Sequence, residues 1–129
     1  MSTTTLHPVP VFIGGEWHVP QTAITTPVYN PSIREIIAET PMCGGDIVDQ
    51  AVQAAQKAFY DWSETPPVER ARVLFRYKML LEEHFEELAR SGSREHGKNI
   101  IEARGDVRRG VEVLEDACAA PELLKGEIL

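Results

Sequence analysis

Few reactive side chains in this 129-residue chain stand at the spacing that catalysis needs. The two cysteines, Cys43 and Cys118, belong to no CxxC pair, so neither a disulfide framework nor a zinc site is expected. His96 has no nucleophile near it in sequence, which favours a solvated or capping histidine over a general base. Lys98 is followed by Asn99 instead of Ser or Thr, so it does not complete a phosphate-binding loop. We therefore predict no catalytic residue and no metal ligand.

Arg109 has acidic residues close to it in sequence. Its residue-level interpretation is an ion pair within the same stretch, with Asp106, Glu112 or Glu102 as the partner. Glu95 and Glu102 are seven residues apart and could share a helix face, but carboxylates on an acidic helix are usually solvated.

Arg109 lies within a helical pattern that covers residues 95–127. Apolar or small residues recur there at steps of three and four, namely Ile101, Ala103, Val107, Gly110, Val111, Leu114, Ala117, Cys118 and Pro121. This spacing makes one face of a helix apolar. We predict a helix over residues 99–124, and because such a helix is unstable alone, its stripe needs a partner. The residues before it can form that partner, or a small sheet beside it.

The preceding residues give the other elements. Residues 1–10 are predicted to be a flexible leader and residues 11–41 short strands, with a hairpin turn at Gly14-Gly15, where both positions tolerate a positive φ. Helices are predicted over residues 46–62 and 67–90, the second starting at Pro67. Residues 91–93 interrupt the apolar pattern and indicate a loop, although Gly97 would equally suit the end of a helix. The fold class is α+β, mostly α, and we expect the last two helices to be antiparallel.

Composition narrows the classes of partner. The net charge is −7 and the pI is about 5.1, and no basic run is present to neutralise phosphates, which argues against a nucleic-acid partner. No apolar stretch approaches the roughly 20 residues that a membrane-spanning helix needs. The first ten residues lack the basic start and apolar centre of a signal peptide, so a cytoplasmic location is expected.

Several segments carry a family resemblance. They are FIGGEW, YNPS, AFYDW, ERARVLFRYKMLLEEHFEELA, EHGKNIIEARGDVRRGVEVLEDAC and LLKGE. In this order, from about Val11 to Leu129, they resemble the aldehyde dehydrogenase superfamily. The EARGDVRRGVEVLE and LLKGE segments are most similar to its CoA-acylating methylmalonate-semialdehyde dehydrogenase branch.

The resemblance implies an N-terminal part of that fold, incomplete over residues 11–129. The family's nucleophilic cysteine, general-base glutamate and oxyanion-hole asparagine would lie beyond Leu129, as would the residues that meet NAD. NAD and CoA are therefore expected as cofactors of the full-length family, whereas this chain alone is expected to bind none and to be catalytically inactive. The resemblance also implies that these helices lean against a nucleotide-binding half of the larger protein. Arg109 matches an arginine that faces the substrate carboxylate in the methylmalonate-semialdehyde branch, and a guanidinium binds a carboxylate through two parallel hydrogen bonds. The ion pair within its own stretch remains the alternative.

Two classes of function remain open. The chain could be the N-terminal piece of an NAD-dependent, CoA-acylating semialdehyde dehydrogenase, arising from a truncated, split or decayed gene. It could instead be a non-enzymatic helical interaction module, or a decayed paralogue, that oligomerises or binds an intact homologue through an uncovered apolar face. Family members continue the helix at residues 91–93 with apolar pairs, so Ser and Gly there are expected to destabilise the fold.

Overall fold

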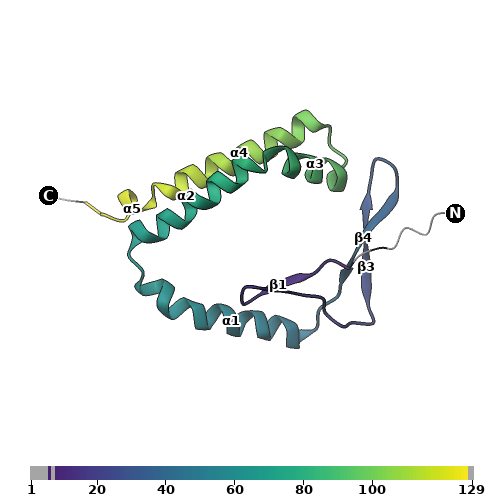
Figure 1. Ribbon diagram of the computed structural model, residues 1–129, viewed down its shortest axis with the longest axis horizontal. Helices are drawn as coiled ribbons and strands as arrows, with labels where there is room; N and C mark the ends of the chain where they lie inside the picture. Colours follow the sequence, from purple (N-terminus) through teal and green to yellow (C-terminus); the bar gives the residue numbers. More distant parts are fainter. Residues whose placement is uncertain (1–5, 7, 128–129) are drawn as a thin grey trace. The chain divides into compact units, whose positions relative to one another are not determined.

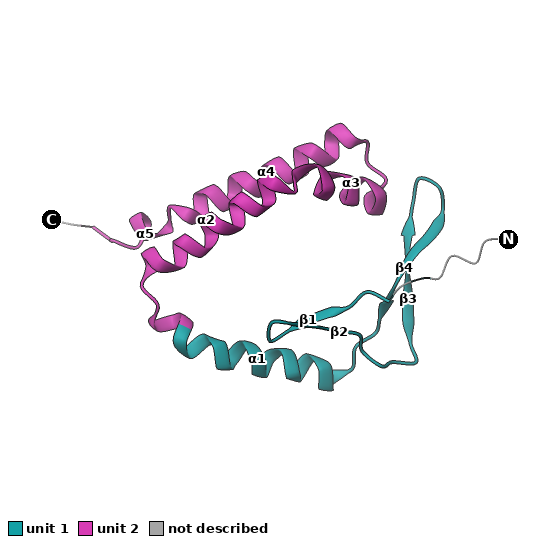
Figure 2. Ribbon diagram, in the orientation of Figure 1, with its two compact units in different colours: residues 1–61 teal, residues 62–129 magenta. Residues whose placement is uncertain are grey.

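The computed structural model describes residue 6 and residues 8–127, which divide into two compact units, Met1–Asp61 and Trp62–Leu129 (Figure 2). Each unit is described by itself. Most of the predicted leader, residues 1–5 and 7, lies outside the described residues. Its last part is not free of structure, because the Val9 amide donates to the Glu39 carbonyl at 2.8 Å.

The first unit begins with a hairpin of β1 (Val11–Ile13) and β2 (Glu16–His18). The strands pair antiparallel, with Phe12 opposite Trp17 and their ring centroids 4.8 Å apart. Gly14 and Gly15 connect them with φ of 62° and 91°. Positive φ at both central residues is the conformation of a type I′ hairpin turn, so the turn predicted at the glycine pair is confirmed.

A second ribbon follows, formed by β3 (Thr25–Asn30) and β4 (Glu35–Pro41). These strands are also antiparallel, and their register shifts between Val28 and Tyr29. At the turn, the Asn30 side chain accepts a hydrogen bond from the Ser32 amide at 3.0 Å. The two ribbons form separate two-stranded sheets (Figure 1). Such ribbons are marginal by themselves, so they need cover from elsewhere.

Helix α1 (Gly45–Glu64) contains no buried residue. Val48, Val52 and Phe59 are each more than half exposed. A helix normally gains most of its stability by burying an apolar face, and α1 does not do so among the described residues.

The second unit is entirely helical after the end of α1: α2 (Pro67–Glu83), α3 (Phe85–His96), α4 (Ile100–Cys118) and the short α5 (Ala120–Leu123) (Figure 1). The single helix expected over residues 67–90 is therefore two helices. His84 separates them, with φ −97° and ψ 16°, values that lie outside the helical range. The pattern of apolar residues runs through this break, so periodicity alone does not reveal it.

The loop expected at residues 91–93 is instead helical. Helix α3 runs on to His96 and ends at Gly97, whose φ of 74° is the left-handed conformation of a helix C-terminus. Ser91 and Gly92 are exposed, and a Cβ built on Gly92 would meet nothing within 4 Å. The destabilisation expected from Ser and Gly in a packed interior does not apply in this unit, because these two positions face solvent.

The core of the second unit lies where α4 packs against α2 and α3. The buried residues are Ala71, Ala89, Ala103, Val111, Leu114 and Cys118. Ion pairs join Lys78 to Glu115 and Glu86 to Arg104, so residue numbers rise along one helix as they fall along the other. The predicted antiparallel arrangement is confirmed. Val111, Leu114 and Cys118, on the apolar face of α4, are already buried within the unit. This part of the face therefore needs no partner from outside the unit.

The α+β, mostly helical fold class predicted from the sequence is confirmed, with short antiparallel strands preceding the helices. The number of helices differs from the three that were expected, because His84 divides one of them and α5 adds a further turn.

Candidate functional site

The turn from α3 into α4 is held by local hydrogen bonds that position Lys98. The Gly97 amide donates to the Ser93 carbonyl at 2.9 Å, and the Ser93 hydroxyl donates to the Lys98 carbonyl at 2.6 Å. Asn99 caps α4, because its side-chain oxygen accepts from the Glu102 amide at 3.0 Å. The Lys98 side chain therefore leaves a fixed turn at the N-terminus of α4.

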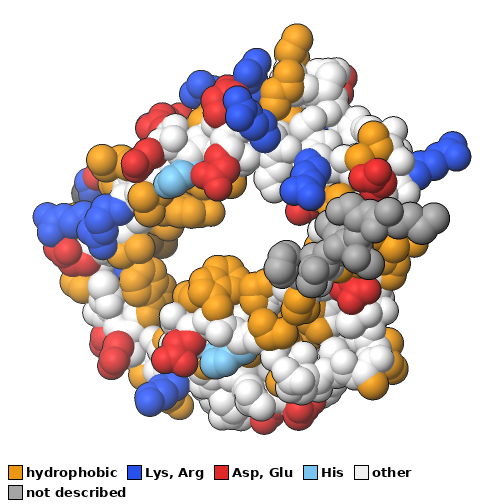
Figure 3. Space-filling view, turned by 45° about the vertical axis from the view of Figure 1, so that its right-hand side comes forward, with side chains coloured by type: hydrophobic (Ala, Val, Ile, Leu, Met, Phe, Trp, Pro, Cys, Tyr) orange, Lys and Arg blue, Asp and Glu red, His pale blue; other side chains and the backbone are white. Residues whose placement is uncertain are grey.

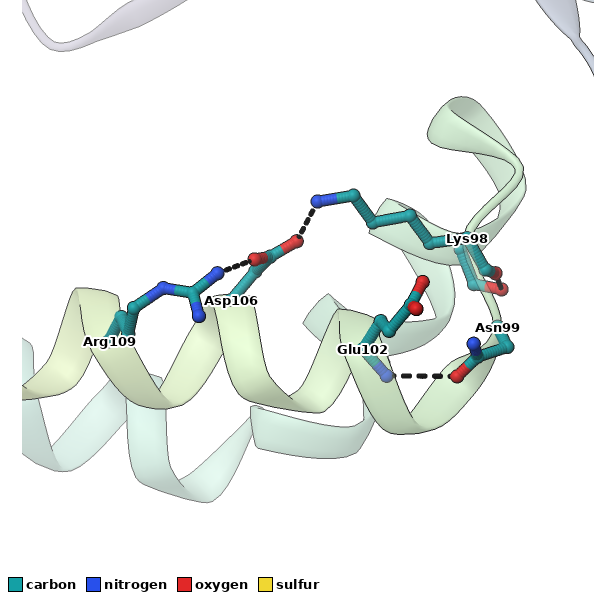
Figure 4. A network of polar contacts seen from close by, with 6 residues as sticks. Lys98, Asn99, Glu102, Asp106 and Arg109 are labelled. Atoms are coloured by element: carbon teal, nitrogen blue, oxygen red, sulfur yellow. Dashed lines mark hydrogen bonds and ion pairs between the residues drawn. The ribbon is translucent and has the colours of Figure 1, made fainter.

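Asp106 joins two cations on one side of α4 (Figure 4). The Lys98 Nζ donates to Asp106 Oδ2 at 2.5 Å, and an Arg109 Nη2 donates to the other oxygen, Oδ1. The side chains are 34% exposed for Lys98, 38% for Asp106 and 71% for Arg109. We call these three residues the Asp106 triad.

The pKa of Asp106 is lowered from its ordinary value, chiefly by the hydrogen bond from Lys98. The positive charges of Lys98 and Arg109 act in the same direction, whereas desolvation opposes them. Asp106 is therefore an ionised carboxylate near neutral pH. Two cations share one carboxylate, which leaves an excess positive charge able to contact an anion.

Arg109 is placed on the exposed side of α4, and its partner is Asp106, one of the three acids weighed in the sequence analysis. The sequence analysis excludes Lys98 as a phosphate-loop lysine and does not predict its pairing with Asp106. The two residues are eight positions apart in sequence, beyond the i,i+4 spacing at which helical ion pairs are recognised. The Asn99 cap was the available signal, because it fixes where the chain enters the helix.

The structure brings neither cysteine to a catalytic partner. Cys43, in the first unit, is half-buried and its Sγ donates to the Pro41 carbonyl at 3.7 Å. Cys118, in the second unit, is buried in the helical core. Across residue 6 and residues 8–127, no cluster of three or more His, Cys, Asp or Glu residues is arranged to hold a metal ion.

A dinucleotide cradle would need glycines and free amides at a helix N-terminus. Gly44 precedes α1 and Gly45 is its first residue, but Asp46 follows in the first turn. An oxygen of the Asp46 carboxylate lies 2.8 Å from the position that a Gly44 Cβ would take. Asp46 therefore places an acidic side chain at this helix N-terminus, which disfavours the pyrophosphate of NAD there. Within the described part of the chain, no helix is long and apolar enough to cross a membrane.

Comparison with known proteins places the chain in a family. Residues 17–129 match the aldehyde dehydrogenase family. A malonate-semialdehyde dehydrogenase of Bacillus pumilus is 46% identical over 129 residues, which are 100% of this chain and 26% of that protein. A malonate-semialdehyde dehydrogenase of Oceanobacillus iheyensis gives the same identity and coverage.

Solved structures agree. The methylmalonate-semialdehyde dehydrogenase of Oceanimonas doudoroffii superposes with a TM-score of 0.85 at 46% identity, covering 90% of this chain and 24% of that one. A putative methylmalonate-semialdehyde dehydrogenase of Sinorhizobium meliloti, solved with NAD, gives 0.91 at 32% identity, covering 98% and 26%. The chain thus spans about a quarter of the length of the curated relatives it matches. From this match over most of its length, the chain belongs to the aldehyde dehydrogenase family.

Proposed function

We propose that this chain supplies the N-terminal part of an NAD-dependent, CoA-acylating dehydrogenase of malonate or methylmalonate semialdehyde. The observation that carries the proposal is the 46% identity to a malonate-semialdehyde dehydrogenase, which extends over all 129 residues and is not confined to one motif. The backbone likeness to a methylmalonate-semialdehyde dehydrogenase, with a TM-score of 0.85, supports the same branch. A cytoplasmic location fits the two free cysteines.

Within that enzyme, Arg109 contacts the substrate carboxylate. Its side chain is 71% exposed, so it is accessible to a ligand. Asp106 orients the guanidinium, and Lys98 neutralises Asp106 so that the charge of Arg109 stays available to a second anion. Malonate semialdehyde carries a carboxylate at the end opposite its aldehyde, which is the group that a guanidinium binds.

The chain alone is catalytically inactive. Its described residues provide no nucleophile beside a base, and the N-terminus of α1 disfavours a dinucleotide phosphate. NAD, held elsewhere in the whole enzyme, would accept the hydride, and CoA would accept the acyl group. The contribution of these residues is to form the helical framework and to present Arg109.

A chimera tests the proposal. The matching quarter of the Bacillus pumilus malonate-semialdehyde dehydrogenase is replaced by residues 1–129 of this chain, and NAD reduction is measured with malonate semialdehyde and CoA. We expect activity from the chimera and none from the chain by itself. A chimera that folds but does not turn over the semialdehyde, while the parent enzyme does, would refute the function. Turnover by the isolated chain would refute its inactivity.

A second function is favoured by the exposed side chains of α2. Phe75, Tyr77, Met79 and Leu80 are each more than half exposed, and Figure 3 shows hydrophobic side chains gathered in patches on the face that it draws. Exposed apolar patches often mark protein-binding surfaces. An interaction module that self-associates or binds an intact aldehyde dehydrogenase subunit would show a discrete oligomer or hetero-complex by light scattering. A chain that serves only within a larger enzyme would form no discrete oligomer and no such complex.

A further inference from the structure

A groove of about 230 Å³ lies at one end of the second unit, which begins at Trp62, and residues of α2, α4 and α5 line it together with Trp62. Its lining includes Trp62, Arg70, Leu74, Ala117, Pro121 and Leu124. All the lining residues other than Arg70 are apolar. We call it the Arg70 groove.

Arg70 differs from Arg72 and Lys78, the two cations of α2 whose ion pairs are described. Its Nε is buried and has no hydrogen-bond partner, and no ion pair reaches its side chain from the described residues. By contrast, Arg72 pairs with Glu69, and Lys78 pairs with both Glu82 and Glu115. Buried polar groups in folded proteins are nearly always hydrogen-bonded, and a charged group left unpaired in apolar surroundings destabilises the fold. The buried Nε of this half-buried guanidinium therefore lacks an acceptor.

A carboxylate on a polypeptide is the acceptor that suits this groove best. A guanidinium pairs best with a planar, two-oxygen anion, and the apolar lining strengthens the pairing by excluding water. This chain covers 26% of the length of its curated relatives, so about three quarters of their sequence lies outside the matched part. An apolar surface with one unpaired cation suits a segment in which an Asp or Glu is flanked by apolar residues.

We propose that the Arg70 groove docks an acidic side chain, flanked by apolar residues, from the remaining part of the aldehyde dehydrogenase fold. Arg70 is the anchor of this contact and Trp62 and Leu74 form its apolar floor. The inference rests on the proposed function in one respect, that the remaining part of the fold is the partner. It adds the surface, the anchor residue and the chemistry of the group that is bound.

The test uses Arg70→Leu in two settings, with Arg72→Leu as the matched control. Arg72 lies on the same helix, but its pair with Glu69 is exposed on both sides, so its loss should matter little in either setting. In the isolated chain, Arg70→Leu removes an unpaired buried donor, so the melting temperature should stay the same or rise. In the chimera the same change breaks a buried pair, and we expect the melting temperature to fall by about 3–8 °C. Arg70→Lys keeps the charge but loses the two-pronged geometry of the guanidinium. In the chimera its melting temperature should lie between those of wild type and Arg70→Leu.

The opposite signs make the proposal falsifiable. The proposal is overturned if Arg70→Leu changes the melting temperature equally in the isolated chain and in the chimera, or leaves that of the chimera unchanged. This holds even if the chimera is fully active. An inactive chimera that still loses stability on Arg70→Leu would leave the docking intact and refute the proposed function.

A peptide array gives a readout that does not depend on a folded chimera. Overlapping peptides from the unmatched three quarters of the Bacillus pumilus relative are probed with wild-type chain and with Arg70→Leu. Wild type should retain peptides with an Asp or Glu among apolar residues, and Arg70→Leu should lose them. Absence of such peptides would overturn the proposal. Hexanoate tests a small carboxylate as the acceptor. If no peptide binds, but hexanoate raises the melting temperature of wild type and not of Arg70→Leu, the acceptor is a small carboxylate and the proposal is overturned.

Discussion

Arg104 of α4 holds Glu86 of α3 through two parallel hydrogen bonds, from Nε to Oε1 at 2.8 Å and from Nη2 to Oε2 at 2.9 Å. This two-pronged geometry is the most directional ion pair available to proteins. It joins helices that are separated in sequence by the turn at residues 97–99. The pKa of Glu86 is lowered mainly because of the hydrogen bond from Arg104.

Glu86→Gln should change how stability depends on acid. A carboxyl group whose pKa is lowered on folding stabilises the protein above its unfolded pKa, about 4.5, and loses that contribution as pH falls through the folded pKa. Wild type should therefore be more stable than Glu86→Gln at pH 7, and the two should converge below pH 4.5. Urea midpoints between pH 7 and pH 3 measure this. Glu87→Gln is the control, because Glu87 is 79% exposed. A constant gap between wild type and Glu86→Gln down to pH 3 would contradict the linkage.

Val111 and Val113 of α4 allow the same substitution to be compared at a buried and at an exposed position. Val111 is 1% exposed, in the core between α2, α3 and α4, whereas Val113 is 68% exposed. Val111→Ala removes two buried methyl groups and leaves a small cavity, so it should lower the free energy of unfolding by about 2 kcal/mol. Val113→Ala should stay within about 0.5 kcal/mol of wild type. Chemical denaturation of both variants checks the pair, and similar losses would mean that α4 does not pack as described.

Gly92 and Gly97 should respond to alanine with opposite signs. Gly92 is exposed inside α3, where a Cβ meets nothing within 4 Å, so Gly92→Ala should stabilise by about 0.5–1 kcal/mol. Gly97 has φ 74° at the end of α3, a conformation that costs an L-residue about 1–2 kcal/mol, so Gly97→Ala should destabilise by that amount. Thermal melting distinguishes the two. Destabilisation by Gly92→Ala would support a loop at residues 91–93.

Arg109→Met in the chimera should weaken substrate binding. Hydrogen bonds to a charged group contribute about 1.5–3 kcal/mol, so the KM for malonate semialdehyde should rise roughly 10- to 100-fold. Arg108→Met is the neighbouring control. Arg108 lies over the Phe85 ring, 5.2 Å from its centroid, and its loss should affect stability more than KM. Comparable KM changes in both variants would remove Arg109 from the binding role.

The elements that sequence predicts well are those with a strong local signal. The Gly14-Gly15 hairpin follows from the conformational freedom of glycine, and α4 follows from a regular apolar spacing. The division at His84 was missed because helix-forming residues continue on both sides of it. The helix through residues 91–93 was missed because Ser and Gly have low propensity, yet tertiary contacts at Ala89 and Ala103 hold that part of the fold.

In the Asp106 triad, too, only the contacts between residues close in sequence could be predicted. Arg109 and its acidic neighbours are visible in the sequence, since i,i+3 pairs on a helix are local. The reach of Lys98 to Asp106 depends on the turn at Gly97 and the cap at Asn99, so it required the backbone. Arg70 gave no signal at all. Its isolation is visible only once the positions of the other charges on α2 are known.

Helix α1 carries twenty residues, and none of them is buried. In the isolated chain its amides should exchange with deuterium early, whereas those of α4, which contributes Val111, Leu114 and Cys118 to the core, should be the slowest. The 129 residues thus contain a helix, α4, that is protected by its own core, and a helix, α1, whose protection depends on contacts made by other parts of the larger fold.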